Sequence, residues 1–227
     1  MTTQLRTERL GATLLFILDG SSHHNALSGA IYAAGVEALN VAESNPELRS
    51  VVITGAGGHF SSGDEDPEPL PEHMAALGRW IEALQAFPKP VVAAVEGMAE
   101  GAACALALAC DLVVAARDAR FAPAHAGTGL AVAGDFSFLL ARTLSRQQAL
   151  EWLWLAPPRD ARYLQSLGLV NQVVEPGQAQ SAALALCERL HAMPLHALSA
   201  RKELMNRAVQ WTVERGQFTP VDDEAPR

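Results

Sequence analysis

Short apolar runs alternate with longer amphipathic segments along the first half of the chain. Segments 49–54 and 91–95 are apolar almost throughout, which is typical of strands buried on both faces of a sheet. Segments 28–42 and 73–87 instead carry apolar residues at helical intervals, and a proline-containing turn follows each of them. This alternation predicts parallel strands joined by helical crossovers, which is the organisation of an α/β fold.

The remaining segments complete this outline. Residues 5–18 are expected to form two strands interrupted at Gly11, 101–109 a helix and 112–115 a strand. Beyond Gly134 the pattern turns mostly helical, apart from a short strand at 170–174. The helices expected in this part span 135–143, 146–155, 159–166, 177–192 and 195–212.

This pattern divides the chain into a core and a helical appendage. We expect residues 1–175 to form the core and residues 176–215 a helical C-terminal part. Residues 216–227 carry prolines and acids and are expected to be a disordered tail.

Composition narrows the classes of function. The chain has 227 residues, 49% of them hydrophobic, which is enough for a sizeable core. A formal net charge of -8 argues against a general nucleic-acid or membrane-surface binder. No charge-free apolar run reaches about 18 residues, and the N-terminus lacks the layout of a signal peptide. We therefore expect a cytoplasmic protein.

The cysteines and the acidic loop do not form a metal motif. Cys104, Cys110 and Cys187 are an odd number in apolar surroundings, so they are interpreted as reduced core thiols. The consecutive acids 64–66 lie in a proline-rich loop, where solvated side chains are the ordinary outcome. We expect no metal and no separate cofactor.

Two glycine-bearing segments carry the chemical signal. Residues 55–64 follow the apolar run that ends at Thr54, and residues 96–104 follow the run 91–95 and open an alanine-rich helix. Each is predicted to be a strand followed by a tight turn, with backbone N–H groups facing a ligand. Two such groups aimed at one oxygen form an oxyanion hole, often the largest catalytic contribution in acyl-group chemistry.

A nucleotide-binding module predicts the same alternation of strands and helices. Its phosphate-binding glycines should follow the first strand and open a helix. Here Gly55, Gly57 and Gly58 are followed by Phe60 and an acidic, proline-rich loop, which argues against a dinucleotide site.

An ordered set of short motifs runs through residues 5–205. The motifs are His24-Asn25-Ala26-Leu27, Val52-Ile53-Thr54-Gly55, Phe60-Ser61-Ser62-Gly63, Lys89-Pro90-Val91, Ala94-Val95-Glu96-Gly97, Gly101 to Asp111, Phe121, Gly129-Leu130 and Gly168-Leu169-Val170. Together they resemble the enoyl-CoA hydratase/isomerase (crotonase) superfamily. Stretches 33–58 and 80–116 are also similar to members of aromatic-acid-CoA degradation, including oxepin-CoA hydrolase-like proteins.

The resemblance implies a ββα spiral core that binds acyl-CoA thioesters and assembles as homotrimers or hexamers. It implies that the backbone N–H groups of Ser62 and Ala102 form the oxyanion hole. It also implies that His24 contacts the CoA phosphate, although an ordinary turn histidine is an open alternative. The substrate-binding positions implied by the resemblance are His24, Ala26, Ser62, Gly63, Asp64, Met98, Gly101 and Ala102.

The chain departs from the family where hydratases carry their two catalytic glutamates. These positions map to Ala105 and His125, and the aspartate of some isomerases and hydrolases maps to Ala133, two residues before Asp135. Concerted hydration needs both groups, whereas one base suffices to shuttle a proton. Isomerisation or thioester hydrolysis is therefore favoured over hydration.

His125 and Asp135 are the candidate bases. His125 ranks first because a neutral imidazole accepts a proton at physiological pH, whereas a carboxylate opening a helix is stabilised as an anion. The missing glutamates also leave open a non-catalytic protein that binds CoA esters or partner subunits.

Overall fold

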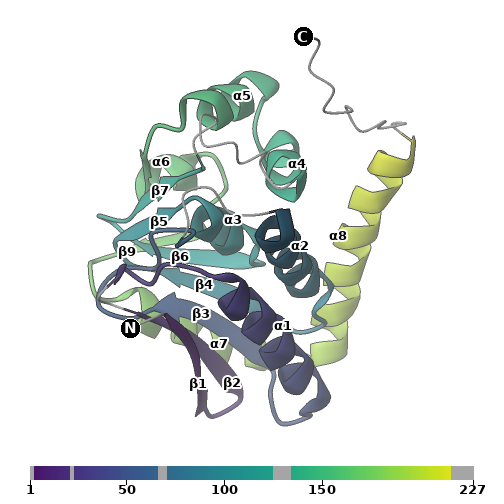
Figure 1. Cartoon of the computed structure of the whole chain (residues 1–227). Coiled ribbons are helices and arrows are strands. Elements are labelled where there is room, and N and C mark those ends of the chain that lie inside the picture. The colour runs from purple at the N-terminus through teal and green to yellow at the C-terminus, as the bar shows by residue number, and fades with distance from the viewer. Residues whose placement is uncertain (1–2, 21–22, 66–70, 125–133, 216–227) are drawn as a thin grey trace.

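A computed structural model describes residues 3–20, 23–65, 71–124 and 134–215. Its centre is a six-stranded sheet in the order β1-β2-β3-β4-β6-β9 (Figure 1). The first pair is an antiparallel hairpin, and every other pair in this sheet is parallel. The strands are β1 (Gln4–Leu10), β2 (Thr13–Asp19), β3 (Ser50–Gly55), β4 (Val91–Val95), β6 (Leu112–Ala116) and β9 (Gln172–Val174).

Side-chain alternation along β2 shows how the sheet separates two hydrophobic clusters. Phe16 and Leu18 belong to the larger cluster, whereas Leu15 and Ile17 belong to the smaller one, because successive strand residues face opposite sides. Helices α1 (Gly29–Ser44), α2 (Pro71–Ala86) and α3 (Ala102–Ala109) contribute to the larger cluster, and α7 (Ala179–His191) covers the other face. Figure 1 shows this layered arrangement.

A second, small sheet was not predicted from the sequence. It contains β5 (Met98–Glu100), β7 (Arg120–Ala122) and β8 (Arg159–Asp160) in that order. Strands of two or three residues are too short to show an alternating pattern. This sheet nevertheless fixes the segment between β4 and α3.

The helices from Gly134 onward agree closely with the sequence pattern. They are α4 (Gly134–Thr143), α5 (Arg146–Leu155), α6 (Ala161–Ser166), α7 and α8 (Leu195–Arg215). The predicted disordered tail lies outside the described residues. Among the helices described, none is long and apolar enough to span a membrane.

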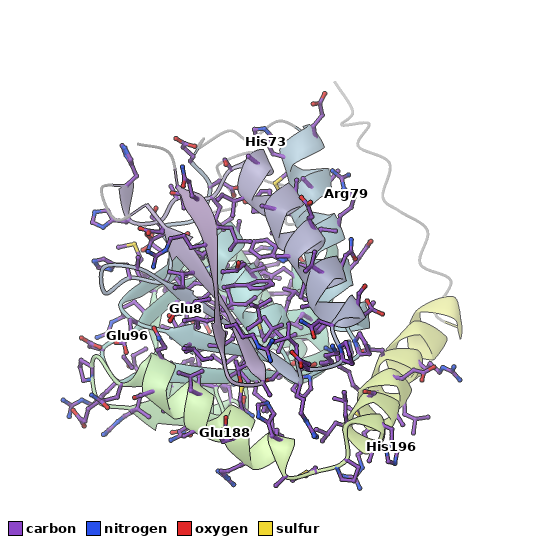
Figure 2. All side chains as sticks on the ribbon, turned by 90° about the horizontal axis from the view of Figure 1, so that it is seen from below. Glu8, His73, Arg79, Glu96, Glu188 and His196 are labelled. Atoms are coloured by element: carbon purple, nitrogen blue, oxygen red, sulfur yellow. The ribbon has the colours of Figure 1, made fainter. Side chains whose placement is uncertain are left out.

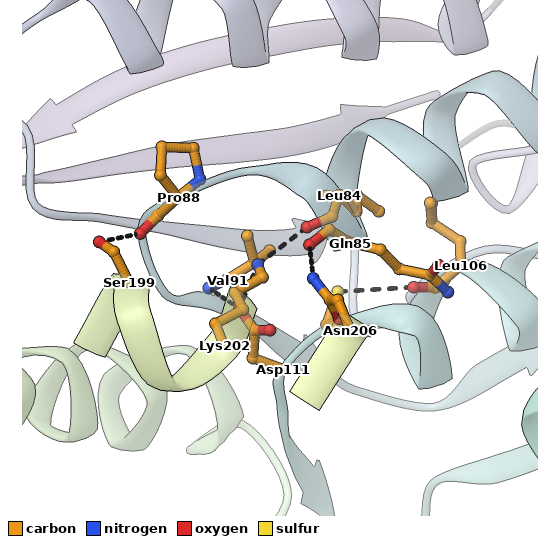
Figure 3. Close-up of polar contacts among 10 residues, drawn as sticks. Leu84, Gln85, Pro88, Val91, Leu106, Asp111, Ser199, Lys202 and Asn206 are labelled. Atoms are coloured by element: carbon orange, nitrogen blue, oxygen red, sulfur yellow. Dashed lines mark hydrogen bonds and ion pairs between the residues drawn. The ribbon is translucent and has the colours of Figure 1, made fainter. Parts of the chain in front are cut away.

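Polar contacts attach α8 to the end of α2, to the turn that follows α2 and to the residue before β6 (Figure 3). Lys202 Nζ donates to Asp111 Oδ2 at 2.8 Å and to the carbonyl oxygen of Leu84 at 2.9 Å. Ser199 Oγ and Asn206 Nδ2 donate to the carbonyl oxygens of Pro88 and Gln85. The position of this long helix therefore depends on directional hydrogen bonds.

The three cysteines are free and buried, as the sequence indicated. Burial raises the pKa of the Cys104 and Cys110 thiols well above its usual range. These thiols therefore stay protonated and pack as small apolar side chains.

A buried hydroxyl pair joins the start of the sheet to the end of α7. Thr13 Oγ1 and Ser50 Oγ lie 2.9 Å apart, and Ser50 Oγ lies 2.9 Å from His191 Nε2. Burial lowers the pKa of His191, Arg49 lowers it further, and Glu188 opposes the change. Figure 2 shows Glu188 on α7, below the sheet.

The His191 environment predicts a contribution to acid sensitivity. Since its pKa is lowered in the folded chain, the unfolded chain takes up the proton first as the pH falls below ~6.5. The contribution of His191 to the free energy of unfolding is therefore fully present above that pH and declines below it. In urea unfolding between pH 8 and pH 5, His191→Gln should lose less stability on acidification than the wild type.

His196→Gln is the matched control, because His196 is exposed at the start of α8 (Figure 2). It should keep the wild-type dependence of unfolding free energy on pH. Equal acid sensitivity in His191→Gln and the wild type would contradict the assignment.

Candidate active site

The two predicted glycine turns meet in the folded chain. The segment carrying Ser61 runs parallel to β5, with Ser61 N donating to the Met98 carbonyl oxygen at 2.9 Å. Gly63 has a φ of +90°, and a Cβ placed on it would lie 2.6 Å from the Glu100 carbonyl oxygen and 3.5 Å from Gly101 Cα. Only a residue without a side chain permits this approach, so the sequence brings the two turns into backbone contact.

In the first turn, the N–H groups of Ser62 and Gly63 donate hydrogen bonds to acceptors within the protein. Ser62 N donates to the His24 carbonyl oxygen at 2.9 Å, and Gly63 N donates to Ser61 Oγ at 3.1 Å. This differs from the expectation that the Ser62 amide faces a ligand. The sequence pattern could not reveal this bond, because the acceptor lies 38 positions earlier, in a loop of irregular backbone.

The second turn ends in the first residue of α3. Gly101 is its N-cap with a φ of 53°, and no side chain caps the helix. Ala102 is only 4% exposed, and within the described ranges no group accepts its N–H. A buried N–H at a helix start carries the positive end of the helix dipole. This position can therefore bind an oxygen that develops negative charge.

The loop before α1 is held in an unusual backbone conformation by Asn25. His24 and Asn25 have φ values of 50° and 58°. The buried Asn25 side chain accepts from Gly20 N at 2.9 Å and donates to the carbonyl oxygens of Ala56 and His59 at 2.8 Å. These bonds fix the loop beside the first turn.

The predicted CoA-binding residues around this loop have different environments. Ala26 is buried, whereas His24 is exposed, and its ring meets the His59 ring edge-on with centroids 5.0 Å apart. Met98 is partly exposed on β5 beside the first turn. An exposed imidazole at this loop is accessible to an anionic group.

Asp64 is held from α1 by a residue that the sequence analysis missed. Tyr32 Oη donates to Asp64 Oδ1, and burial together with the Asp64 charge raises the pKa of Tyr32 well above its usual range. The tyrosine occupies a helix position that periodicity assigns to the core. Only its phenol group, unusual in an apolar stripe, could have signalled a polar role.

The described residues settle part of the acid–base question. Ala105 is buried on α3, and its methyl side chain supplies no carboxylate. Asp135 lies in the first turn of α4, as predicted, while His125 and Ala133 lie outside the described residues. Within the described ranges no group of three potential metal ligands occurs.

A serine–histidine pair does occur, but Ser50 lies at the start of β3, whereas the first turn follows the end of that strand. Ser50 Oγ approaches His191 Nε2, and His191 Nδ1 lies 3.6 Å from Glu188 Oε1. Ser50 is fully buried, so a substrate cannot reach its hydroxyl. The arrangement is a structural contact between β3 and α7.

The fold and site define an α/β protein in which two backbone turns meet at the start of a buried helix. The sequence pattern of the enoyl-CoA hydratase/isomerase family matches residues 11–220, so the chain belongs to that family. This confirms the resemblance to the superfamily, and solved structures of enoyl-CoA hydratases share the crotonase-like fold of this chain.

Individual relatives cover nearly the whole chain. An enoyl-CoA hydratase structure from Polaromonas sp. JS666 is 43% identical with a TM-score of 0.85, over 93% of this chain and 89% of that one. A 4-chlorobenzoyl coenzyme A dehalogenase from Arthrobacter sp. is 31% identical, over 85% of this chain and 74% of its own. A 2,3-dehydroadipyl-CoA hydratase from Escherichia coli is 30% identical, over 94% and 86%.

The contact between the turns predicts different effects for two glycine substitutions. Gly63→Ala introduces a methyl group against the Glu100 carbonyl, whereas Gly58→Ala, at a φ of 80°, has no neighbour within 4 Å of its Cβ. Both variants carry the strain of a positive φ, and only the first adds a clash. Gly63→Ala should therefore lose more unfolding free energy than Gly58→Ala, by about 1–3 kcal/mol.

Chemical denaturation of both variants and the wild type measures this difference. Equal losses in the two variants would show that the turns do not press against each other as described.

Proposed function

We propose that the chain is an acyl-CoA enzyme that stabilises a thioester enolate between the Ser62–Asp64 turn and the start of α3. The observation that carries this proposal is the Ala102 N–H, which is buried, opens α3 and has no acceptor among the described residues. An enolate oxygen about 3 Å away would satisfy that donor and gain from the helix dipole.

The second donor is proposed to come from the peptide groups of the Ser62–Asp64 turn, which lies against Gly101. Ser62 remains the donor implied by the family resemblance. Its N–H would have to exchange the His24 carbonyl oxygen for the thioester oxygen, a bond of the same kind. The CoA portion is then proposed to extend past His24 and Ala26.

The proposed chemistry is isomerisation or thioester hydrolysis rather than hydration. The buried Ala105 cannot exchange a proton, so one half of a two-carboxylate site is missing. His125 is the proposed base and Asp135 the alternative. Related chains act on CoA esters in different ways, as the names hydratase and dehalogenase record, which supports shared enolate stabilisation with variable proton chemistry.

A non-catalytic CoA-ester-binding protein is the second candidate. The buried Ala105 and the engaged Ser62 amide favour it, because both reduce the groups available for turnover. The two candidates share ligand binding and differ in product formation.

A calorimetric titration with a panel of acyl-CoA esters, followed by mass spectrometry of the mixtures, separates these alternatives. We expect acyl-CoA binding, formation of an isomer or a free acid, and little hydration of crotonyl-CoA. His125→Ala should lower kcat by about 100-fold with little change in affinity. Binding without any product would support the second candidate.

Asp135→Asn is the matched variant in the same assay. If it abolishes turnover while His125→Ala leaves it intact, the base is Asp135. Rapid hydration of crotonyl-CoA by the wild type would contradict the preference against hydration.

We also propose that the chain assembles as a homotrimer or hexamer. Two large apolar residues at the end of α5, Trp154 and Leu155, are 64% and 67% exposed. Adjacent apolar groups of this size usually pack against a partner surface. Light scattering should give three or six times the 24.1 kDa of one chain.

The double variant Trp154→Glu/Leu155→Glu should lower that mass while the circular dichroism spectrum is retained. A stable wild-type monomer at micromolar concentration would contradict assembly.

A further inference from the structure

We propose that Tyr32 is a positioning residue, which holds the Ser62–Asp64 turn in its working geometry through the Asp64 carboxylate. The inference rests on the proposed function of that turn and identifies the α1 side chain that supports it. Its basis is the hydrogen bond from Tyr32 Oη to Asp64 Oδ1.

The location of Asp64 means that this bond affects the contact between the two turns. Asp64 directly follows Gly63, whose backbone lies against Glu100 and Gly101 at the start of α3. A rotation of the Asp64 peptide would therefore move the contact between the two turns. Misplacement of a site group by about 1 Å can change a rate by about 100-fold.

Backbone bonds hold the same turn on one side. Leu27 N donates to the Gly63 carbonyl oxygen at 2.7 Å, and Glu65 N donates to the Leu27 carbonyl oxygen at 2.8 Å. These bonds fix the residues on either side of Asp64 to the segment before α1. Tyr32 adds a side-chain hydrogen bond from α1 itself. The turn is therefore held both by backbone bonds to the segment before α1 and by a side chain of that helix.

Tyr32 is well suited to fix a direction. Its side chain is fully buried, and its ring lies 6.2 Å from the Trp80 ring of α2, at an angle of 50°. Trp80 occupies the space at Gly35, where a Cβ would lie 2.1 Å from Trp80 Cε2. The packed indole therefore limits movement of the phenol, and its hydroxyl is presented to Asp64 by a rigid helix pair.

The bond does not depend on titration of the tyrosine. Burial raises the pKa of Tyr32, and the charge of Asp64 raises it further, so the hydroxyl remains a donor over the range in which the protein is assayed. Asp64 is half-buried, and its Oδ1 accepts this donor.

Tyr32→Phe removes the hydroxyl and keeps the ring. On whichever acyl-CoA ester of the panel gives product, we expect kcat to fall by about 10- to 100-fold, with KM within about 3-fold of the wild type. Asp64→Ala should have a similar effect. The double variant should be no slower than the slower single variant, because both changes remove one interaction.

Asp64→Asn provides the conservative test. Its amide oxygen still accepts a hydrogen bond, so it should recover most of the kcat that Asp64→Ala loses. Two controls match the variants. Tyr163→Phe alters the other tyrosine of the chain, and Glu65→Gln alters the exposed acid beside Asp64. Both should keep the wild-type kcat.

Hydrogen exchange gives a readout that does not require turnover. Tyr32→Phe should accelerate amide exchange at residues 61–65 by at least about 10-fold, with no change in β3. Unchanged exchange in this segment, or a lowered melting temperature with unchanged kcat, would overturn the proposal. So would an Asp64→Asn variant as slow as Asp64→Ala while Tyr32→Phe keeps full activity, since Asp64 would then act chemically.

Failure of the proposed function has a different signature. In that case the wild type binds no acyl-CoA in calorimetry, whereas the exchange experiment still reports whether Tyr32 holds the turn.

Discussion

The contact of Gly63 with Glu100 and Gly101 is the constraint on which the site depends. It joins a turn that follows β3 to a turn that follows β4, so neighbouring parallel strands deliver both segments to one edge of the sheet. A side chain at Gly63 would separate them. The buried Ala102 N–H is proposed as one donor of an oxyanion hole, and the second donor depends on the first turn lying beside it.

Polar groups away from this contact hold the surrounding loops. Asn25 fixes the loop before α1 through its side-chain amide. The Glu96 carboxylate accepts from Gly177 N at 2.9 Å and from Ala179 N at 2.7 Å, which attaches the start of α7 to the segment before β5. Glu96 is labelled beside α7 in Figure 2. Directional bonds therefore fix loops that apolar burial alone would leave adjustable.

Much of the main sheet and most helix positions were predictable, because β3 and β4 are continuously apolar and the helices are long enough to show a period. The small sheet was missed, since strands such as β8, with two residues, carry no pattern. The glycines at 63 and 101 indicated the turns correctly. The bond between Ser62 and His24 and the bond between Tyr32 and Asp64 were not predictable, because both depend on which distant segments the fold brings together.

The backbone N–H at the start of α3 is proposed to polarise a thioester carbonyl. Isotope-edited infrared spectroscopy of a carbonyl-labelled acyl-CoA ester bound to the protein tests it most directly. Ala102→Pro removes this N–H at the first helix position, where proline is well tolerated. The carbonyl band should move to lower frequency on binding to the wild type, and the displacement should be smaller with Ala102→Pro. An equal displacement in both proteins, or none in the wild type, would contradict it.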